Sequence, residues 1–119
     1  MSSAVGCRPA ASSDKEKAMT VIRHYQMTAI NGREDELKSA LILLAQKVIA
    51  MEGCVDLQLF QDQKAPDTFI FIEHWRSLAD HEASGKKLGR EAFSEVMAAV
   101  SAPPLTRCLE PVGQLAPDM

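Results

Sequence analysis

The sequence predicts one α+β domain in which a four-stranded antiparallel sheet carries two helices on one face, the ferredoxin-like arrangement. Four short segments rich in β-branched and aromatic residues, at 20–29, 54–62, 68–75 and 105–112, alternate along the chain as strands do. Two segments with helical spacing of apolar residues separate the first strand from the second and the third from the fourth. The order is therefore β-α-β-β-α-β, and 119 residues are enough for one such domain.

The first strand and first helix follow from residues 20–53. Alternation along 20–29 gives one face Val21, Arg23, Tyr25 and Met27, and the other face Ile22, His24, Gln26 and Thr28. Asn31-Gly32 predicts a turn. Three acidic residues then occupy the first turn of a helix, where the helix dipole favours negative charge, and apolar residues continue to Met51. Gly53 stands where a left-handed cap would end this helix.

The second half of the chain repeats the pattern. Residues 54–62 and 68–75 are strands joined by the turn sequence QKAPD. Ser77 followed by Asp80 fits a helix-capping pattern, and an apolar stripe runs from Leu88 to Val100, although Gly85 and Gly89 loosen the helix. Pro103-Pro104 ends the helix before the last strand.

The third strand indicates a dimer. Phe69, Phe71, Glu73 and Trp75 lie on one side, and Ile70, Ile72 and His74 on the other, so both sides are largely apolar. One chain of this length has helices for only one face. We therefore expect a homodimer formed by sheet-to-sheet packing.

Composition limits the classes of partner. The formal net charge is −3 and the pI about 5.6, which argues against nucleic acid and anionic membranes as partners. No apolar run approaches the ~20 residues of a membrane helix. Three scattered cysteines without a CxxC motif predict free thiols and a cytoplasmic location. Residues 1–18 are expected to be a disordered N-terminal tail, 19–113 the domain and 114–119 a C-terminal tail.

Four segments resemble a known family. TVIRHYQMTAINGREDEL, MEGCVDLQLFQD, PDTFIFIEHW and LEPV are similar to the strands and first helix start of the antibiotic biosynthesis monooxygenase (ABM) family. The resemblance covers roughly 19–113. It implies a dimeric α+β barrel in which each subunit has a pocket between sheet and helices. Some members oxygenate aromatic phenols without metal or flavin, relatives degrade haem, others rearrange small signalling molecules, and fold alone does not decide the reaction.

The sequence departs from the family pattern at two places. Many members have a histidine nine residues after the strand-ending tryptophan, and that position is Ser84 here, with His81 one helical turn earlier. The asparagine, tryptophan and histidine of the haem-degrading relatives fall at Tyr25, Ser84 and Ser94. The resemblance therefore does not extend to haem degradation.

Few side chains could serve a cofactor-free oxygenation, which needs a base, a hydrogen-bond donor and a water-excluding pocket. We expect Tyr25 and Trp75 to hold the substrate and His81 to take its proton, with His24, His74 and Glu73 as further substrate-binding residues. The alternatives are an interface role for His24 and His74, a packing role for Trp75, an exposed position for His81 and a salt bridge from Glu73 to Arg23 or Arg107. No metal site and no cofactor are predicted.

Three functions stay open on this evidence. The first is a cofactor-independent monooxygenase-like enzyme that oxidises a small aromatic or quinol-type molecule. The second is an isomerase or degrader of a small signalling molecule. The third is a dimeric module that binds a small molecule without turnover, so whether the chain is an enzyme is open.

Overall fold

The computed structural model describes residues 20–113, and the predicted tails at 1–18 and 114–119 lie outside the described residues. The elements follow in the order β1 (Val21–Thr28), α2 (Glu34–Ile49), β2 (Cys54–Gln61), β3 (Thr68–Trp75), α3 (Leu78–Leu88), the short 3-10 helix η2 (Arg90–Phe93), α4 (Ser94–Ala99) and β4 (Leu105–Leu109). The strands form one sheet in the order β2-β3-β1-β4 with every neighbouring pair antiparallel. The predicted fold class is confirmed.

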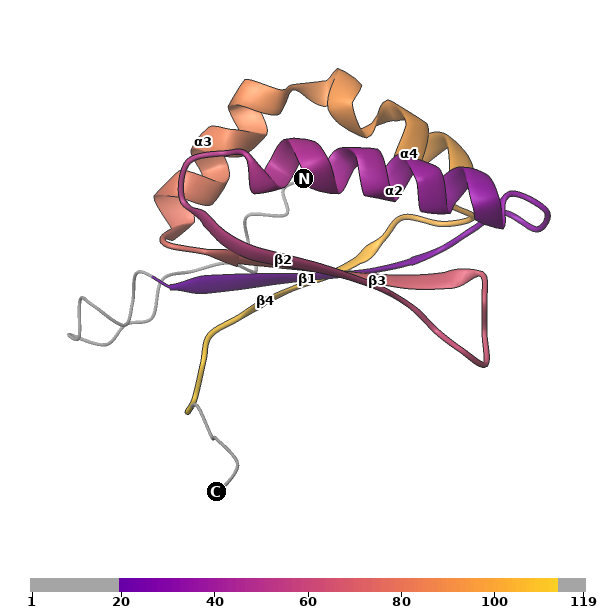
Figure 1. Ribbon diagram of the computed structural model, residues 1–119, viewed down its shortest axis with the longest axis horizontal. Helices are drawn as coiled ribbons and strands as arrows, with labels where there is room; N and C mark the ends of the chain where they lie inside the picture. The colour runs from indigo at the N-terminus through magenta and orange to yellow at the C-terminus, as the bar shows by residue number, and fades with distance from the viewer. Residues whose placement is uncertain (1–19, 114–119) are drawn as a thin grey trace.

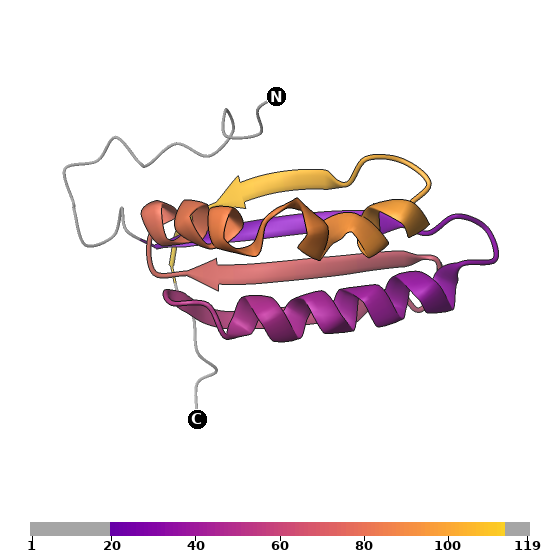
Figure 2. The same cartoon turned by 90° about the horizontal axis from the view of Figure 1, so that it is seen from above.

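The helices that residues 20–113 form all cover the same face of the sheet (Figure 1). From above, α2 runs over the β2–β3 side, and the chain from α3 through α4 runs over β1 and β4 (Figure 2). The core lies between these layers, and its largest fully buried side chains are Trp75, Phe69, Phe71, Leu37, Leu41 and Val48. Within residues 20–113, the helices therefore cover one face of the sheet and leave the other face without a helical layer.

The second predicted helix is divided into three pieces. Gly89 has a φ of 77°, a left-handed conformation that glycine adopts without the penalty of a side chain, and it ends α3. Gly85 stays within α3, so only one of the two glycines breaks the helix. The start of α3 is as predicted, because Ser77 accepts a hydrogen bond from the Asp80 backbone N–H at 3.1 Å.

The cysteines follow the prediction only in part. Cys54 is a free, half-buried thiol, whereas Cys108 is disulfide-bonded, so the expectation of free thiols is wrong for Cys108. Within residues 20–113, no helix has the length and hydropathy needed to cross a membrane.

Candidate active site

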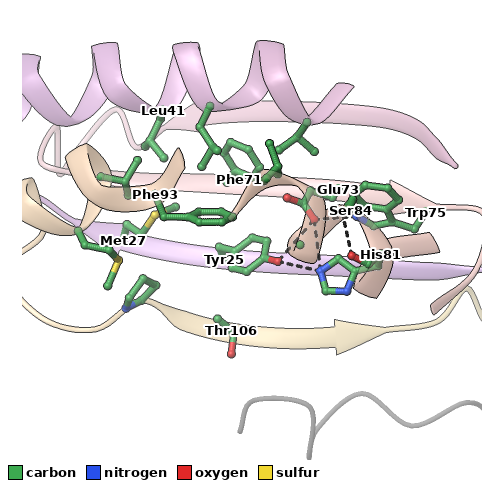
Figure 3. Close-up of a pocket in the computed structure, with 17 residues that line it drawn as sticks. Tyr25, Met27, Leu41, Phe71, Glu73, Trp75, His81, Ser84, Phe93 and Thr106 are labelled. Atoms are coloured by element: carbon green, nitrogen blue, oxygen red, sulfur yellow. Dashed lines mark hydrogen bonds and ion pairs between the residues drawn. The ribbon is translucent and has the colours of Figure 1, made fainter. Parts of the chain in front are cut away.

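A cavity of about 210 Å³ lies between the sheet and the helices. Its walls are mainly apolar side chains from every layer: Met27, Leu41, Leu44, Val48, Phe71, Leu88, Phe93, Val96, Met97 and Pro104. Polar side chains gather at one end, where Tyr25, Glu73, Trp75 and His81 meet (Figure 3). A mostly apolar cavity with a few converging polar groups is the usual form of a small-molecule site.

Glu73 is the buried carboxylate at this end, with 6% of its surface exposed. It lies on the helix-facing side of β3, two residues before Trp75, so both side chains point into the same layer. The Trp75 Nε1–H donates to Glu73 Oε1 at 2.7 Å. The indole N–H therefore fixes the carboxylate and is not available to a bound molecule.

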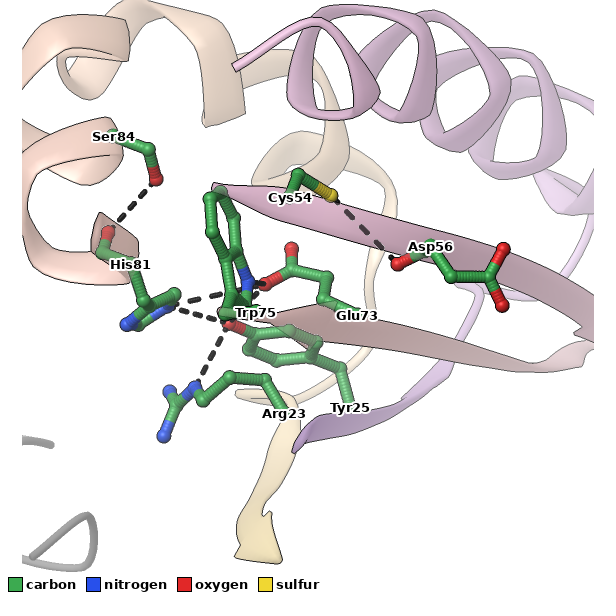
Figure 4. Close-up of polar contacts among 8 residues, drawn as sticks. All are labelled: Arg23, Tyr25, Cys54, Asp56, Glu73, Trp75, His81 and Ser84. Carbon is green, nitrogen blue, oxygen red and sulfur yellow. Dashed lines mark hydrogen bonds and ion pairs between the residues drawn. The ribbon is translucent and has the colours of Figure 1, made fainter. Parts of the chain in front are cut away.

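Tyr25 brings a hydroxyl group to the same carboxylate. It lies on β1 opposite Phe71 of β3, and its ring meets the Phe71 ring edge to face at 5.9 Å. The hydroxyl donates to Glu73 Oε1 at 3.5 Å and accepts from Arg23 Nε at 3.2 Å. The Arg23 guanidinium also lies 5.2 Å from the centre of the Tyr25 ring, a cation–π contact. Tyr25 is thus held between a cation and a carboxylate (Figure 4).

His81 reaches the cluster from the first turns of α3. Its Nε2 is 3.4 Å from the Tyr25 hydroxyl and 3.9 Å from Glu73 Oε1. The ring meets the Trp75 indole edge to face at 5.5 Å, and Ser84 Oγ donates to the His81 carbonyl at 2.8 Å. His81 Nδ1 is buried and makes no hydrogen bond within the described structure. The imidazole is therefore positioned by packing and by the helix, with one nitrogen directed at the cluster.

Burial sets the protonation of these groups. Desolvation, followed by the nearby charge of Glu73, raises the pKa of Tyr25 to about 12. Desolvation also raises the pKa of Glu73, against the opposing effect of the Trp75 hydrogen bond. The pKa of His81 falls to about 4 because of desolvation and the charge of Arg23. At neutral pH the tyrosine and histidine are therefore uncharged, and Glu73 holds a proton more strongly than an ordinary carboxylate.

The structure separates the predicted residues into two groups. Tyr25, Glu73, Trp75 and His81 line the cavity, and Ser84, at the position of the family histidine, is buried in the same wall. His24 and His74 do not line it. Their register partners are Ile72 and Ile22, which places both histidines on the sheet face away from the helices.

Three side chains have neighbours that the sequence pattern did not predict. Arg107 is the register partner of His24 on the opposite face, so it is not the partner of Glu73. Arg23 was considered only as a salt-bridge partner of Glu73, but its Nε donates to Tyr25. Ser84 stands where many family members have a histidine, and its hydroxyl group donates to the His81 main-chain carbonyl. Alternation along β1 is the signal that places Arg23 beside Tyr25. Among residues 20–113, no three His, Cys, Asp or Glu side chains are grouped so as to hold a metal ion.

Comparisons with known proteins agree with this architecture. Residues 20–99 match the family model described as antibiotic biosynthesis monooxygenase. A solved structure from Chloroflexus aurantiacus, provisionally named an antibiotic biosynthesis monooxygenase, has 27% identity and a TM-score of 0.68, with 82% of this chain and 97% of that chain covered. A comparison with curated proteins gives no match.

Two more distant solved structures share the fold. A Pseudomonas aeruginosa protein has 23% identity and a TM-score of 0.69, with 82% of this chain and 98% of that chain covered. A conserved protein from Methanosarcina mazei has 12% identity and a TM-score of 0.72, with 81% and 96% covered. The family model spans more than half of the residues, and the sheet, helices and cavity are arranged as the family resemblance implies. The chain belongs to the antibiotic biosynthesis monooxygenase family.

Proposed function

We propose that the chain is a cofactor-independent oxygenase of a small phenol or quinol, and that the cavity is its substrate site. One observation supports this most strongly. The Tyr25 hydroxyl, His81 Nε2 and Glu73 Oε1 lie within 3.9 Å of one another at one end of an otherwise apolar cavity. A flat aromatic ring fits the apolar part, and its hydroxyl group fits the polar end.

The size of the cavity limits the substrate. An apolar protein cavity of about 150 Å³ is known to bind benzene. The cavity here, about 210 Å³, suits one ring or two fused rings rather than a large polycyclic system. Dihydroxynaphthalenes and naphthols are therefore the first candidates, and anthrones test the upper limit.

The proposed reaction needs no reductant besides the substrate. The substrate hydroxyl gives its proton to the polar cluster, and the phenolate passes one electron to dioxygen. The phenoxyl radical and superoxide combine through a new C–O bond at a ring carbon that bears hydrogen. The peroxide anion regains the proton from the cluster, and loss of the ring-carbon proton with hydroxide breaks the O–O bond and leaves a carbonyl. The sum is hydroxyarene plus O₂ giving quinone plus water.

The protonation state of each residue in the cluster indicates which step of the proposed reaction it serves. Glu73 is the proposed proton acceptor, because burial makes it a stronger base than an exposed carboxylate. The Tyr25 hydroxyl, which bonds Glu73, orients the substrate and relays the proton. His81 was expected to take the proton, but a pKa of about 4 makes the neutral imidazole a weak base. We therefore give His81 Nε2 the role of hydrogen-bond partner to the substrate oxygen, and Trp75 the role of holding Glu73.

Family membership and the uncovered sheet face support a dimer as the functional form. The outer face of the sheet includes exposed Phe60, Leu105 and Leu109, together with Ile22, Ile70 and Ile72. Packing two such faces against each other would bury this apolar surface. It would also place His24 and His74 at the interface, the alternative role that the sequence left open for them.

The test is oxygen consumption with a panel of naphthols, dihydroxynaphthalenes and anthrones. We expect uptake with at least one two-ring substrate, and its loss in Glu73→Gln and in Tyr25→Phe. His24→Gln is the matched control, because it changes the same strand as Tyr25 on the opposite face, and it should keep its activity. Equal turnover without oxygen would favour the isomerase, and ligand-dependent stabilisation without turnover would favour the binding module.

A further inference from the structure

The cavity opens to the surface along one side, next to the edge strand β4. Among the described residues that line it, most are buried or half-buried, and three are exposed: Gly85 of α3, Met97 of α4 and Thr106 of β4. Thr106 lies beside Tyr25, on the strand at the edge of the sheet (Figure 3). The opening therefore lies between α3 and α4 on one side and β4 on the other. We call it the mouth and define it by Gly85, Met97 and Thr106.

One face of α3 borders the cavity and has small residues at its middle. Four cavity-lining residues share this face, spaced three and four apart along the helix: His81, Ser84, Gly85 and Leu88. A helix face that packs on a core normally carries bulky apolar residues at such positions. Here the two middle positions carry a hydroxymethyl group and a hydrogen atom. The room in the cavity beside the imidazole of His81 therefore comes from Ser84 and Gly85.

Neither packing nor backbone conformation requires a glycine at position 85. A Cβ on Gly85 would have no neighbour within 4 Å among residues 20–113 outside its own helix, and its φ is not positive. Glycine within a helix lowers stability relative to alanine, because it loses more conformational freedom on folding. A residue that breaks a local rule without a packing reason is expected where function sets the choice. The open space at Gly85 is therefore a candidate for a functional feature.

We propose that small molecules enter the cavity past Gly85, and that the missing side chain at this position sets the width of the ring system that the mouth admits. A larger side chain there would fill the open space and narrow the mouth. Met97, on the other flank, is 48% exposed and unbranched, so it can change rotamer as a ligand passes. The fixed limit on the passage is therefore the backbone of α3 at Gly85.

Gly85 is a specificity-determining residue in this proposal and takes no part in the chemistry. The proposal rests on the cavity being a small-molecule site, as the proposed function holds, but it does not depend on oxygenation. Glu73 and Tyr25 act on a phenol that has already entered, whereas Gly85 selects by width which phenol can enter. Binding kinetics without turnover can therefore test it separately from the reaction.

Trp75 reports the arrival of a ligand in the cavity. It is the single tryptophan of the chain, it is 1% exposed, and it lines the cavity. Stopped-flow fluorescence of the full chain measures binding of two nonfluorescent phenols that absorb where tryptophan emits, 4-nitrophenol with one ring and 4-nitro-1-naphthol with two. The wild-type protein should show saturable quenching with both probes. Its absence with either probe would overturn the proposed passage.

Gly85→Leu narrows the mouth directly. It should slow association of the two-ring probe about tenfold or more and that of the one-ring probe less. Ala83→Leu is the matched control, because Ala83 is an exposed residue of α3 that does not line the cavity, and it should leave both rates unchanged. Unchanged rates in Gly85→Leu, an equal effect on the two probes, or equal slowing in Ala83→Leu would overturn the proposal.

Gly85→Ala separates access from a structural role. It should raise the urea midpoint of unfolding, since alanine favours the helix and its Cβ meets open space. A lower midpoint would show that the fold itself needs glycine here and would overturn the proposal. Probe binding that responds to Gly85→Leu, without oxygen uptake on any phenol, would count against the oxygenase and leave the passage supported.

Discussion

Among single residues, Glu73 is central to the proposed site because the fold keeps its carboxylate away from water. Glu73 is buried, and its carboxylate accepts hydrogen bonds from the Trp75 indole N–H and from the Tyr25 hydroxyl. A buried charge is costly unless it is hydrogen-bonded or paired, and the cost is what raises the carboxyl pKa. The same burial holds Tyr25 and His81 in their uncharged forms.

The single tyrosine of the chain makes its pKa directly measurable. Ultraviolet absorbance should show Tyr25 ionising at about pH 12 in the folded protein, because the cavity wall and Glu73 disfavour tyrosinate. The same titration in denaturant should have a midpoint near the ordinary value of about 10. Glu73→Gln should lower the folded midpoint by removing the nearby negative charge. A folded-state midpoint near 10, with the fold verified by circular dichroism, would contradict the burial of this hydroxyl.

His81 should make stability depend on pH. Its folded pKa of about 4 is below the ordinary value of 6.5, so only the unfolded chain gains this proton as pH falls through that range. The contribution of the neutral His81 side chain to the free energy of unfolding is fully present above pH 6.5 and is lost by about pH 4. The lowering of its pKa corresponds to about 3 kcal/mol of free energy, at about 1.36 kcal/mol per pKa unit.

Urea unfolding of the wild-type protein and of His81→Gln between pH 7 and pH 4 measures this effect. The difference between the two free-energy curves should shrink as pH falls. Glu73 changes stability with pH in the opposite direction, because its raised pKa favours the folded state at low pH. Both proteins contain Glu73, so its effect cancels when the two free-energy curves are subtracted. Parallel curves would mean that His81 is exposed and titrates normally.

Residue patterns predicted which side chains meet, but not how they bond. Alternation along β1 and β3 put Tyr25, Glu73 and Trp75 on the helix-facing side, and the structure shows them there. Trp75 is predicted to hold the substrate or to serve as a packing residue, yet its indole N–H donates to Glu73. Strand alternation fixes the face of a side chain, whereas the rotamer that sets its partner depends on packing with distant residues such as His81.

At the scale of the element, the site depends on how α3 begins. Arg76 and Asp80 form an ion pair at 2.8 Å, and Ser77 caps the helix through the Asp80 N–H. The Arg76 backbone N–H donates to the Gly53 carbonyl at 2.7 Å, which joins the residue before β2 to the segment that leads into α3. His81 follows Asp80 directly, so this junction positions the imidazole.

Gly53 allows the close approach at this junction. Its φ is 90°, and a Cβ added there would lie 2.5 Å from the Asp80 side chain. Gly53→Ala should therefore destabilise the fold by roughly 3 kcal/mol, because left-handed strain and the clash add. Gly32→Ala is the matched control, since Gly32 has the same φ with no atom within 4 Å, and it should cost roughly 1 kcal/mol. Urea denaturation compares the two, and equal losses would remove the clash from the explanation.

The helices and strands were predictable because apolar residues recur along them with a clear helix or strand period. The break in the second predicted helix was not predictable in this way. The third strand has the predicted bounds, and the others differ by a few residues at their ends. The apolar stripe from Leu88 to Val100 predicted one helix, but Gly89 ends α3 and the chain continues through η2 to α4. A glycine within a helical pattern is compatible with both outcomes, as the unbroken helix at Gly85 shows.

In the whole molecule, the elements formed by residues 20–113 leave one face of the sheet without a covering layer. The sequence predicted this from the apolar residues on both sides of β3, and Figure 1 shows helices on one side only among the described residues. The sequence also predicted a second copy as the partner, but the residue pattern of one strand does not specify how two sheets would pack against each other.

Ile72→Lys tests the sheet-to-sheet dimer. Ile72 lies on a central strand with its side chain on the outer face, between His24 on β1 and Gln58 on β2. A lysine at this position would bury an unpaired charge in a sheet-to-sheet interface, so we expect the dimer to dissociate while each chain stays folded. Light scattering after size exclusion measures the mass, with Phe60→Gln as a milder variant at the edge strand. An unchanged mass in Ile72→Lys would place any dimer contact elsewhere.

The origin of the product oxygen is the most direct test of the proposed oxygenase. Purified protein is given oxygen-18 gas and the naphthol or dihydroxynaphthalene that supports turnover, and the quinone is analysed by mass spectrometry, with labelled water as the reciprocal control. The account predicts one atom from dioxygen in each product molecule, formed by the wild-type protein and by His24→Gln but not by Glu73→Gln. A product without label, or one formed equally well by Glu73→Gln, would contradict oxygenation at this cluster.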